Sequence, residues 1–570
     1  MTKPFFSSET EKRAWIALLA VAFLLRVVAL GAKPYHHDES IHASSANNLA
    51  FRGEYRYDPV YHGPVQYFAV ATALRIHGLF VSEKAMAPGE GDAAARFPAA
   101  LGGVALVALA LLLRPRFGGA AALVAGALLA VSPNILYTSR FCREDVWSLL
   151  GTAGGFLFLD AYVRGNRLRD VAASALFFAM AFASKENFYV LLALMVPSLV
   201  ASWAEAGRGL DVWNRLRKLI DYLETHAAAL GGALLLFFNV SLLAYTVFLH
   251  HPESGNPVFD AISYWWGQHK VERVSGPKTF HLPRILMYEF AIVVPALALI
   301  LRRWRTLSAV ERFLAGWGVS SLAMYAYLGE KTPWLIVHQV LPFVPLAARA
   351  WVEAWEASPR WKPVGFAAAA VTLWYAVSLS FVHPAITPAS PKAESVVYVQ
   401  TCPEMLELRD RILAYGRVGE VPAAIVTGEA GWPMTWYVRR APVNWEMPRG
   451  DIRPPLVICD LKQADEAART LGPAYVREKD VPFRGWWIPE TSLWPPIPSI
   501  GDLATYLLTR EVWRGKLPPE TNPIGSVWVA VFRRVGPATA SPPPPAPEGV
   551  PEAPADPAGD PKPDTAGGVS

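Results

Sequence analysis

Residues 14–32 read AWIALLAVAFLLRVVALGA, and residues 34–39 follow as PYHHDE. The first stretch is apolar apart from Arg26 and is long enough to cross a bilayer as a helix, which takes about 20 residues. The second stretch places two adjacent carboxylates, Asp38 and Glu39, beside two histidines at the membrane surface. Ionisable groups at such a boundary are costly to hold there and indicate a functional site. Capping and solvation of a loop would explain the same pair, so the motif alone leaves both interpretations open.

The composition is that of a membrane protein. Of the 570 residues, 53% are hydrophobic and 18% are charged, and the mean hydropathy is +0.24. The 21 Trp and 20 Tyr suit an extensive membrane–water boundary, where their amphipathic rings settle. The net charge of +5 is small for this length and argues against a nucleic-acid partner. Three cysteines are too few for a disulfide framework, although Cys402 and Cys459 would pair if they lay close together.

Long apolar segments recur along the first two thirds of the chain and predict about eleven membrane spans. They lie at 14–32, 96–113, 118–137, 145–163, 171–184, 188–203, 226–249, 285–301, 312–328, 334–351 and 363–382. No small-residue cleavage site follows the first segment, so we expect a retained span rather than a removed signal peptide. The segment 65–82 is also apolar, but Arg75 and His77 interrupt it, and we expect it to lie on the membrane surface.

The basic residues of the loops predict the orientation. With the N-terminus in the cytoplasm and 65–82 outside, each cytoplasmic loop carries a basic cluster, as the positive-inside rule expects. These clusters are Arg114/Arg116, Arg164/Arg167/Arg169, Arg208/Arg215/Arg217/Lys218, Arg302/Arg303/Arg305 and Arg360/Lys362. The unusual polar motifs then all lie on the opposite face. We therefore predict a multi-pass protein of the inner (cytoplasmic) membrane with its C-terminal region outside the cytoplasm.

The composition changes near residue 384. Strand-length apolar runs at 395–400, 423–427, 435–438 and 456–459 alternate with helical patterns at 404–415 and 463–471. This alternation predicts a small extracytoplasmic α/β domain over 384–535, and residues 536–570, rich in Pro and Ala, read as a disordered tail. The fold class is thus a polytopic α-helical transmembrane domain, 1–383, whose first outer loop, 33–95, carries the candidate catalytic residues.

The predicted spans are almost free of charge, whereas carboxylates and cations gather at one boundary. A transporter would place its ionisable groups near the midplane. The pattern therefore favours an enzyme whose substrate has a lipid tail and a polar head. Asp38 can serve as general base with Glu39 as its partner, and Asp145 or Glu144 can complete the site from the second loop. A helix N-cap explains Glu144 and Asp145 as well.

Outward-facing cations suit a phosphate leaving group because they stabilise the charge that develops on its oxygens. The candidate substrate-binding residues are the cations Arg140, Arg143, Lys185, Lys270, Arg273 and Lys331, together with His62, Glu186 and Glu330. Anchoring at lipid headgroups would explain the cations without a substrate, and ion pairs with the adjacent glutamates would explain Lys185 and Lys331. The histidines of the first outer loop match no standard zinc spacing, and we expect structural roles for most of them.

Together these motifs resemble the GT-C superfamily of membrane glycosyltransferases, which includes the dolichyl-phosphate-mannose–protein mannosyltransferases. The acidic pair after the first span, the turn His62-Gly63-Pro64 and the segment ARFPAAL at 95–101 carry this resemblance. A wider set resembles the flippase-activity-associated protein subfamily: DESIH (38–42), YDP (57–59), SRF (139–141), SKEN (184–187), EKTPW (330–334) and WPMTWYVR (432–439).

The resemblance implies a polyprenyl-phosphate-linked sugar donor and transfer with inversion on the outer face. It assigns the base or acceptor-orienting role to Asp38, the partner role to Glu39 and the second-loop acid to Asp145 or Glu144. Some members use a divalent metal and others do not, so Mg²⁺ or Mn²⁺ stays possible. The acceptor is open among protein, lipid and polysaccharide. The alternative function is a non-catalytic binding partner for a lipid-linked sugar in a flippase or glycan-assembly system.

Overall fold

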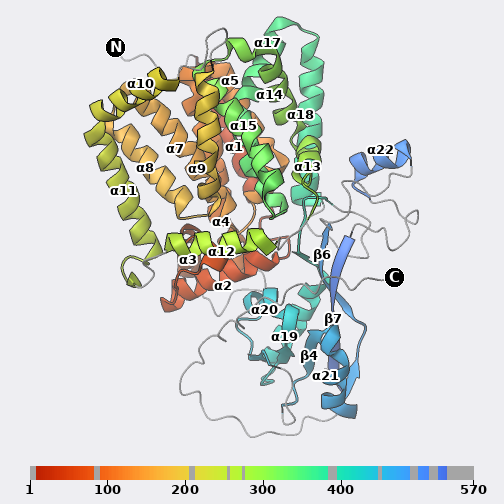
Figure 1. The fold of residues 1–570 in the computed structure, drawn as a ribbon. Coiled ribbons are helices and arrows are strands. Elements are labelled where there is room, and N and C mark those ends of the chain that lie inside the picture. The colour runs from red at the N-terminus through yellow and green to blue at the C-terminus, as the bar shows by residue number, and fades with distance from the viewer. Residues whose placement is uncertain are drawn as a thin grey trace.

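The computed structural model describes residues 8–81, 90–204, 212–252, 257–271, 276–382, 394–446, 452–487, 499–511 and 524–535. Figure 1 shows a helical bundle with a smaller, sheet-containing domain beyond one of its ends. The main helices of the bundle are α1 (Glu9–Val27), α4 (Glu90–Leu109), α5 (Arg114–Val131), α7 (Asp145–Gly165), α8 (Leu168–Phe182), α9 (Asn187–Trp203), α11 (Ala227–Tyr245), α14 (Phe290–Arg303), α15 (Ala309–Tyr327), α17 (Phe343–Ala357) and α18 (Trp361–Val377). Four shorter helices are α6 (Pro133–Thr138), α10 (Val212–Thr225), α13 (His281–Tyr288) and α16 (Ile336–Val340).

Within the described residues, four helical runs are long and apolar enough to cross a membrane, or up to six if two bent helix pairs each count as one span. One of these runs, Gly91–Val131, has 41 residues. It bends at Gly118, whose φ of 85° is not helical, so it corresponds to two of the predicted spans. The multi-pass architecture agrees with the sequence, while the count of about eleven spans stays a prediction.

Small residues let the helices of the bundle approach closely. At Gly151 on α7, an added Cβ would lie 2.6 Å from the backbone of Phe177 and Ala181 on α8. Such small-residue contacts replace the hydrophobic driving force that is missing between helices in lipid.

Three helices lie across the end of the bundle that faces the sheet domain (Figure 1): α2 (His37–Arg52), α3 (Val65–Phe80) and α12 (Pro257–Val271). The helix α3 matches the segment that we expected to lie on the membrane surface, and it is not among the candidate spans. It buries Tyr67, Val70 and Leu74 against its neighbours.

The second domain contains a seven-stranded mixed sheet in the order β1-β6-β7-β4-β2-β3, with β5 paired to β7. Its strands are β1 (Gln400–Thr401), β2 (Ala424–Val426), β3 (Val443–Asn444), β4 (Leu456–Asp460), β5 (Tyr475–Arg477), β6 (Val481–Trp487) and β7 (Ile524–Arg534). The helices α19 (Glu404–Arg417), α20 (Gly431–Tyr437) and α21 (Ala464–Leu471) lie beside the sheet. The predicted α/β domain is therefore present. All three cysteines are free and buried, so Cys402 and Cys459 are not paired.

Three details of the predicted domain are wrong. The run 395–400 is not a strand apart from its last residue, Gln400, where β1 begins. The run 435–438 belongs to the helix α20 rather than to a strand, because this apolar turn buries Trp436 and Tyr437 against the first outer loop. The central strand β7 and its neighbour β6 were not recognised; a proline and a glycine interrupt the apolar pattern of β6.

The domain boundary is also less simple than 384–535. The helix α22 (Ile500–Thr509) returns from the sheet domain to the side of the bundle (Figure 1), where Tyr506 joins the bundle core. Val396 and Val397 join the same core. The predicted disordered tail and part of the linker between the domains lie outside the described residues.

Candidate functional site

The acidic pair lies on the first turn of α2. His36 is the N-cap: its Nδ1 accepts a hydrogen bond from the backbone N–H of Asp38 at 3.1 Å, and the Glu39 carboxylate accepts one from the N–H of His36 at 2.9 Å. His36 Nε2 lies 2.5 Å from the carbonyl oxygen of Tyr398. Because Nδ1 is an acceptor, Nε2 carries the proton and donates to this carbonyl. Burial lowers the pKa of His36 to about 4, so the ring is neutral at pH 7.

Glu39 is fully buried in a two-pronged ion pair with Arg96 of α4. Both Arg96–Glu39 hydrogen bonds measure 2.7 Å, and the backbone N–H of Cys142 donates to the same carboxylate at 2.8 Å. Burial alone would raise the pKa of Glu39, but Arg96 outweighs it and holds the pKa at about 2. This carboxylate has its partners already and no open side. The structure therefore contradicts a reacting role for Glu39 and gives it a positioning role at the start of α2.

Asp38 has the opposite environment. Its side chain is 30% exposed, and Arg143 Nη1 donates to its carboxylate at 2.5 Å. Burial would raise the pKa of Asp38, but the charge of Arg143, aided by the nearby histidines, holds the pKa well below its usual range. Arg143 also lies flat against Trp334, 4.1 Å from the ring centre. Asp38 is thus an ionised, partly open carboxylate.

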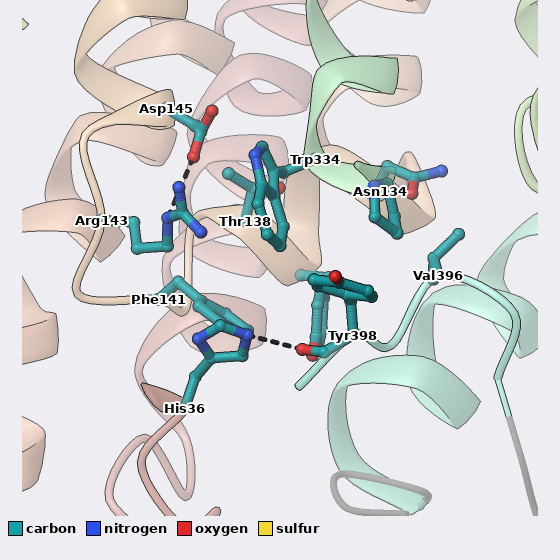
Figure 2. Close-up of a pocket in the computed structure, with 11 residues that line it drawn as sticks. His36, Asn134, Thr138, Phe141, Arg143, Asp145, Trp334, Val396 and Tyr398 are labelled. Atoms are coloured by element: carbon teal, nitrogen blue, oxygen red, sulfur yellow. Dashed lines mark hydrogen bonds and ion pairs between the residues drawn. The ribbon is translucent and has the colours of Figure 1, made fainter. Parts of the chain in front are cut away.

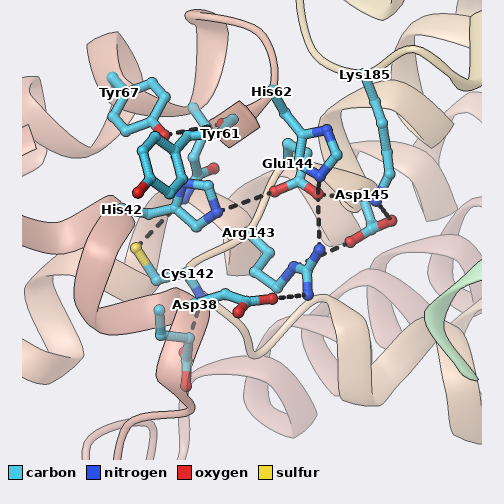
Figure 3. A network of polar contacts seen from close by, with 12 residues as sticks. Asp38, His42, Tyr61, His62, Tyr67, Cys142, Arg143, Glu144, Asp145 and Lys185 are labelled. Carbon is cyan, nitrogen blue, oxygen red and sulfur yellow. Dashed lines mark hydrogen bonds and ion pairs between the residues drawn. The ribbon is translucent and has the colours of Figure 1, made fainter. Parts of the chain in front are cut away.

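Glu144 is the centre of the buried network in Figure 3. Arg143 and Lys185 donate to its carboxylate at 3.0 and 2.8 Å, and His42 and His62 lie 3.4 and 3.5 Å from it. Burial would raise the pKa of Glu144, but the charges of Arg143 and Lys185 hold the pKa well below its usual range. Glu144 occupies the N-cap position of α7, as the N-cap interpretation expects, but its side chain makes no capping bond to the helix.

Asp145 is bound from three directions. Lys185 Nζ lies 2.5 Å from its carboxylate, His338 lies 3.6 Å away and Arg143 Nε lies 3.4 Å away. The predicted ion pair of Lys185 therefore exists, but its partners are Glu144 and Asp145 rather than the adjacent Glu186.

His62 connects this network to the surface helices. Its Nδ1 lies 2.5 Å from the carboxylate of Glu186, and its ring stacks on Trp265 of α12 with 4.9 Å between ring centres. Its φ of 66° is rare for a residue with a side chain and is typical of functional sites. The next residue must be a glycine here, because a Cβ on Gly63 would lie 2.2 Å from the carbonyl oxygen of Ala183.

Two predicted substrate-binding cations instead cap helices. Arg140 donates to the carbonyls of Leu25 and Arg26 at the end of α1, at 2.9 and 3.0 Å. Lys331 donates to carbonyls at the end of α15, including Ala326 at 2.9 Å. Free C-terminal carbonyls attract cations. These carbonyl contacts explain both cations without a substrate, and their role in binding a phosphate stays a prediction.

The other predicted binding residues are more dispersed. Lys270 is exposed near the end of α12, whereas Glu330 is half-buried beside Lys331. Arg273 lies outside the described residues. The structure does not bring Lys270 or Glu330 into the network around Glu144.

A pocket adjoins this network where the two domains meet (Figure 2). Its lining residues are His36, Asn134, Tyr137, Thr138, Phe141, Arg143, Asp145, Pro333, Trp334, Val396 and Tyr398. The polar groups of Arg143 and Asp145 therefore face a space whose other walls are largely aromatic. Sequence reasoning missed Asn134 and Tyr398, which line the pocket, and His338, which contacts Asp145, because no local pattern marks residues that only the fold brings together.

The sheet domain contacts the acidic loop directly. Gln400 donates to the carbonyl of Pro34 at 2.9 Å, and the hydroxyl of Tyr437 accepts from the N–H of Tyr35 at 2.7 Å. Arg484 of β6 is buried and donates to the carbonyl of Glu429 at 2.8 Å. Burial lowers the pKa of Arg484, while the charge of Glu429 acts in the opposite direction. Nothing local in the sequence marked this arginine.

A resident divalent metal does not fit the donors at this site. Within the part of the chain that the structure describes, no group of three or more His, Cys, Asp or Glu side chains has the geometry of a metal site. The carboxylates of Asp38, Glu144 and Asp145 are each in contact with a basic side chain. We therefore derive no step through a metal, and the dependence on Mg²⁺ or Mn²⁺ stays a prediction.

Comparisons with known proteins agree with this fold. Residues 85–210 match the model of the dolichyl-phosphate-mannose-protein mannosyltransferase family. The structure is similar to that of ArnT from Cupriavidus metallidurans bound to undecaprenyl phosphate, with a TM-score of 0.51 and 17% identity over 80% of this chain and 95% of that one. It is also similar to the Archaeoglobus fulgidus oligosaccharyltransferase in complex with Zn and sulfate, with a TM-score of 0.50 and 14% identity over 81% of this chain and 67% of that one. No curated protein sequence matches the chain.

These similarities confirm the GT-C resemblance at the level of the fold. The finer assignment to the flippase-activity-associated subfamily stays a prediction.

Proposed function

We propose that this protein is a membrane glycosyltransferase that moves a sugar from a polyprenyl-phosphate donor to an acceptor hydroxyl on the extracytoplasmic face, with inversion. The acceptor oxygen forms a bond to the anomeric carbon while the bond from that carbon to the phosphate oxygen breaks. The polyprenyl phosphate leaves with the electron pair, and the acceptor proton passes to the Asp38 carboxylate. Single displacement at the anomeric carbon inverts its configuration.

The observation that carries the proposal is the exposure of Asp38. It is 30% exposed, whereas Glu144 and Asp145 in the same network are 0% and 1% exposed. A general base must reach the proton of its substrate, so an open carboxylate held by a buried scaffold fits this role. The GT-C fold, shared with a protein whose structure contains undecaprenyl phosphate, supports the same reading.

Arg143 links donor binding to the basicity of Asp38. While it is paired with Asp38, it lowers the pKa of that carboxylate and makes it a weak base. A donor phosphate that binds the guanidinium competes for this charge, which raises the basicity of Asp38 when the donor is present. Donor binding would therefore prepare the base.

Glu144, Asp145 and Lys185 act as positioning residues in this proposal. They are buried, Lys185 binds both carboxylates, and the two carboxylates hold Arg143 beside Asp38. Glu144 and Asp145 lie at the start of α7, and Asp38 lies on the first turn of α2, which Figure 1 shows at the end of the bundle that faces the sheet domain. This is the face predicted to be extracytoplasmic, opposite the basic loops.

The test is turnover in a purified, lipid-supplied system. The protein in nanodiscs is incubated with a panel of undecaprenyl-phosphate monosaccharides and candidate acceptors, and release of undecaprenyl phosphate is measured by mass spectrometry. Asp38→Asn should reduce turnover by at least about 100-fold without loss of folding. The matched control is Asp410→Asn, an exposed carboxylate of the sheet domain. Wild-type turnover in Asp38→Asn would overturn the proposal.

A second candidate is a non-catalytic binder of lipid-linked sugar. The observation that favours it is the ion pair between Asp38 and Arg143, which neutralises the proposed base in the absence of ligand. This candidate predicts saturable binding of the undecaprenyl-phosphate sugar with no release of undecaprenyl phosphate, and unchanged binding in Asp38→Asn.

A further inference from the structure

One wall of the pocket comes from the sheet domain. Residues 394–398 run from the edge of the bundle toward β1, and Val396 and Tyr398 line the pocket opposite the bundle residues (Figure 2). The carbonyl of Tyr398 accepts the hydrogen bond of His36 Nε2 at 2.5 Å. The same short segment therefore contacts the pocket with its side chains and the start of the acidic helix with its backbone. We refer to residues 394–398 as the strap.

A buried polar cluster fastens the first residue of the strap. Glu394 accepts a hydrogen bond from Ser378 at 2.9 Å and another from the hydroxyl of Tyr288. Arg510, just after α22, pairs with Glu394 at 3.3 Å and lies 4.0 Å from the ring centre of Tyr375. Glu394 and Arg510 are both fully buried.

This cluster has no role in the proposed reaction, yet burying its two charges costs desolvation free energy. A buried ion pair contributes little net stability, and such pairs are more readily explained by specific positioning. Glu394 fixes the strap to α13 and α18 of the bundle, while Arg510 fixes it to the end of α22. Three segments far apart in the sequence thus hold one wall of the pocket.

The lining of the pocket indicates its occupant. Trp334 and Tyr398 form a tilted aromatic pair with 5.7 Å between ring centres, and Asn134, Arg143 and Asp145 supply polar groups nearby. Aromatic faces with a few placed polar groups suit a ring that is apolar on its faces and polar at its edge. A single glycosyl unit has this character, whereas a polyprenyl chain needs no polar partners. The cavity volume is about 20 Å³ in this structure, room for little more than one water molecule, so the pocket has to widen when such a ring enters.

We propose that the pocket holds the glycosyl unit of the donor, that the strap is its specificity-determining wall, and that Glu394 and Arg510 are the positioning residues of this wall. The inference rests on the proposed function. It adds that the sheet domain, through Tyr398, selects the sugar. The strap also fixes the proton position on His36, and through the His36 cap it supports the backbone of Asp38.

The first test removes the wall without removing the backbone contact. Tyr398→Ala loses the ring but keeps the carbonyl that binds His36. With the undecaprenyl-phosphate sugar that the wild type accepts, the KM should rise about tenfold with a smaller change in kcat, because a binding contact is lost. Tyr398→Phe should restore the wild-type KM. Tyr415→Ala, a half-buried tyrosine of α19, is the matched control and should leave the KM unchanged.

Binding of undecaprenyl phosphate, which lacks the sugar, distinguishes contacts to the sugar from contacts to the lipid phosphate. Its affinity should be the same in the wild type and in Tyr398→Ala. If Tyr398→Ala lowers the affinity for undecaprenyl phosphate as much as the affinity for the undecaprenyl-phosphate sugar, the pocket binds the phosphate or the lipid. That result would overturn the inference. An unchanged KM in Tyr398→Ala would also overturn it, even where Asp38→Asn abolishes turnover and the proposed function holds.

The second test addresses the buried ion pair between Glu394 and Arg510. Glu394→Gln leaves Arg510 buried without its carboxylate, so unfolding of this variant alone would be ambiguous. The double variant Glu394→Gln/Arg510→Met removes both charges and is expected to fold. Its KM for the donor should rise about as much as in Tyr398→Ala, with unchanged affinity for undecaprenyl phosphate. A folded double variant with the wild-type KM would contradict the positioning role.

Discussion

Asp38 and Glu39 are neighbours in the chain and have the same charge, but the structure gives them different tasks. Successive residues on a helix point about 100° apart, so one turn of α2 directs Glu39 into the bundle and Asp38 toward the domain boundary. Glu39 has Arg96 and two backbone N–H groups as partners. Asp38 shares Arg143 with two other carboxylates and stays partly open. A carboxylate that is fully satisfied positions the helix, whereas one that is incompletely enclosed can meet a substrate.

The largest expected effect is on Glu39. Glu39→Gln would leave the buried guanidinium of Arg96 without its carboxylate, and should lower the free energy of unfolding by about 4 kcal/mol. Asp38→Asn should lower it by less than about 1 kcal/mol, because Arg143 keeps Glu144 and Asp145. Thermal unfolding in detergent measures both. Equal losses of stability would remove the distinction between the two carboxylates.

Lys185 allows a second test of the buried carboxylates, here Glu144 and Asp145. Lys185→Met leaves Glu144 and Asp145 close together with one strong cation fewer, and should lower the free energy of unfolding by about 3 kcal/mol. Adding Asp145→Asn should recover part of this loss, because a like charge is removed with its partner. If the double variant is as unstable as the sum of the single variants, the two residues are not coupled.

The histidines around the acidic pair predict a pH dependence of stability. Burial lowers the pKa of His36 and of His42 to about 4, below the value near 6.5 of an unfolded histidine. The unfolded chain therefore binds protons first as the pH falls. Stability should be complete above pH 6.5 and should fall toward pH 4, by about 2 kcal/mol per histidine at pH 5.

Unfolding midpoints recorded between pH 7 and pH 5 measure this slope, and His42→Gln should make it shallower. The ion pair of Glu39, whose pKa is about 2, should begin to weaken only below about pH 4.5. A stability that is constant between pH 7 and pH 5 would show that these histidines are not buried as neutral rings.

The smallest effect on stability is expected at Lys270, an exposed cation that no buried group needs. Lys270→Gln should change the free energy of unfolding by less than about 0.5 kcal/mol. If the donor phosphate reaches this end of α12, the affinity for undecaprenyl phosphate should still fall several-fold and become less sensitive to salt. Unchanged affinity at low salt would limit the role of Lys270 to the membrane surface.

The features that the sequence predicted and the structure contains share a local cause. The apolar spans, the surface helix 65–82 and the acidic pair after the first span are all set by neighbouring residues. The glycine of His62-Gly63-Pro64 marked a turn, and the structure shows why no other residue fits there. Strands such as β4 were recognisable as short buried apolar runs.

The cations show what the sequence could not predict. Arg140, Arg143, Lys185 and Lys331 looked alike in the sequence as cations near one boundary. In the structure, two of them cap helices and two neutralise buried carboxylates. Arg140 reaches the end of α1, 115 residues earlier in the chain, and Lys185 reaches carboxylates 41 and 40 residues away. Lys331 instead binds carbonyls only 3 to 6 residues before it. Only the fold distinguishes these environments.

The sequence by itself therefore determined a membrane protein with its polar chemistry at one boundary, because hydropathy and charge are properties of contiguous residues. Only the tertiary structure decided that Glu39 is enclosed and Asp38 is open, and that Tyr398, from the segment before β1, lines the pocket beside them. The physical reason is that enclosure depends on what surrounds a side chain in space. For these residues, most of those surroundings come from distant parts of the chain.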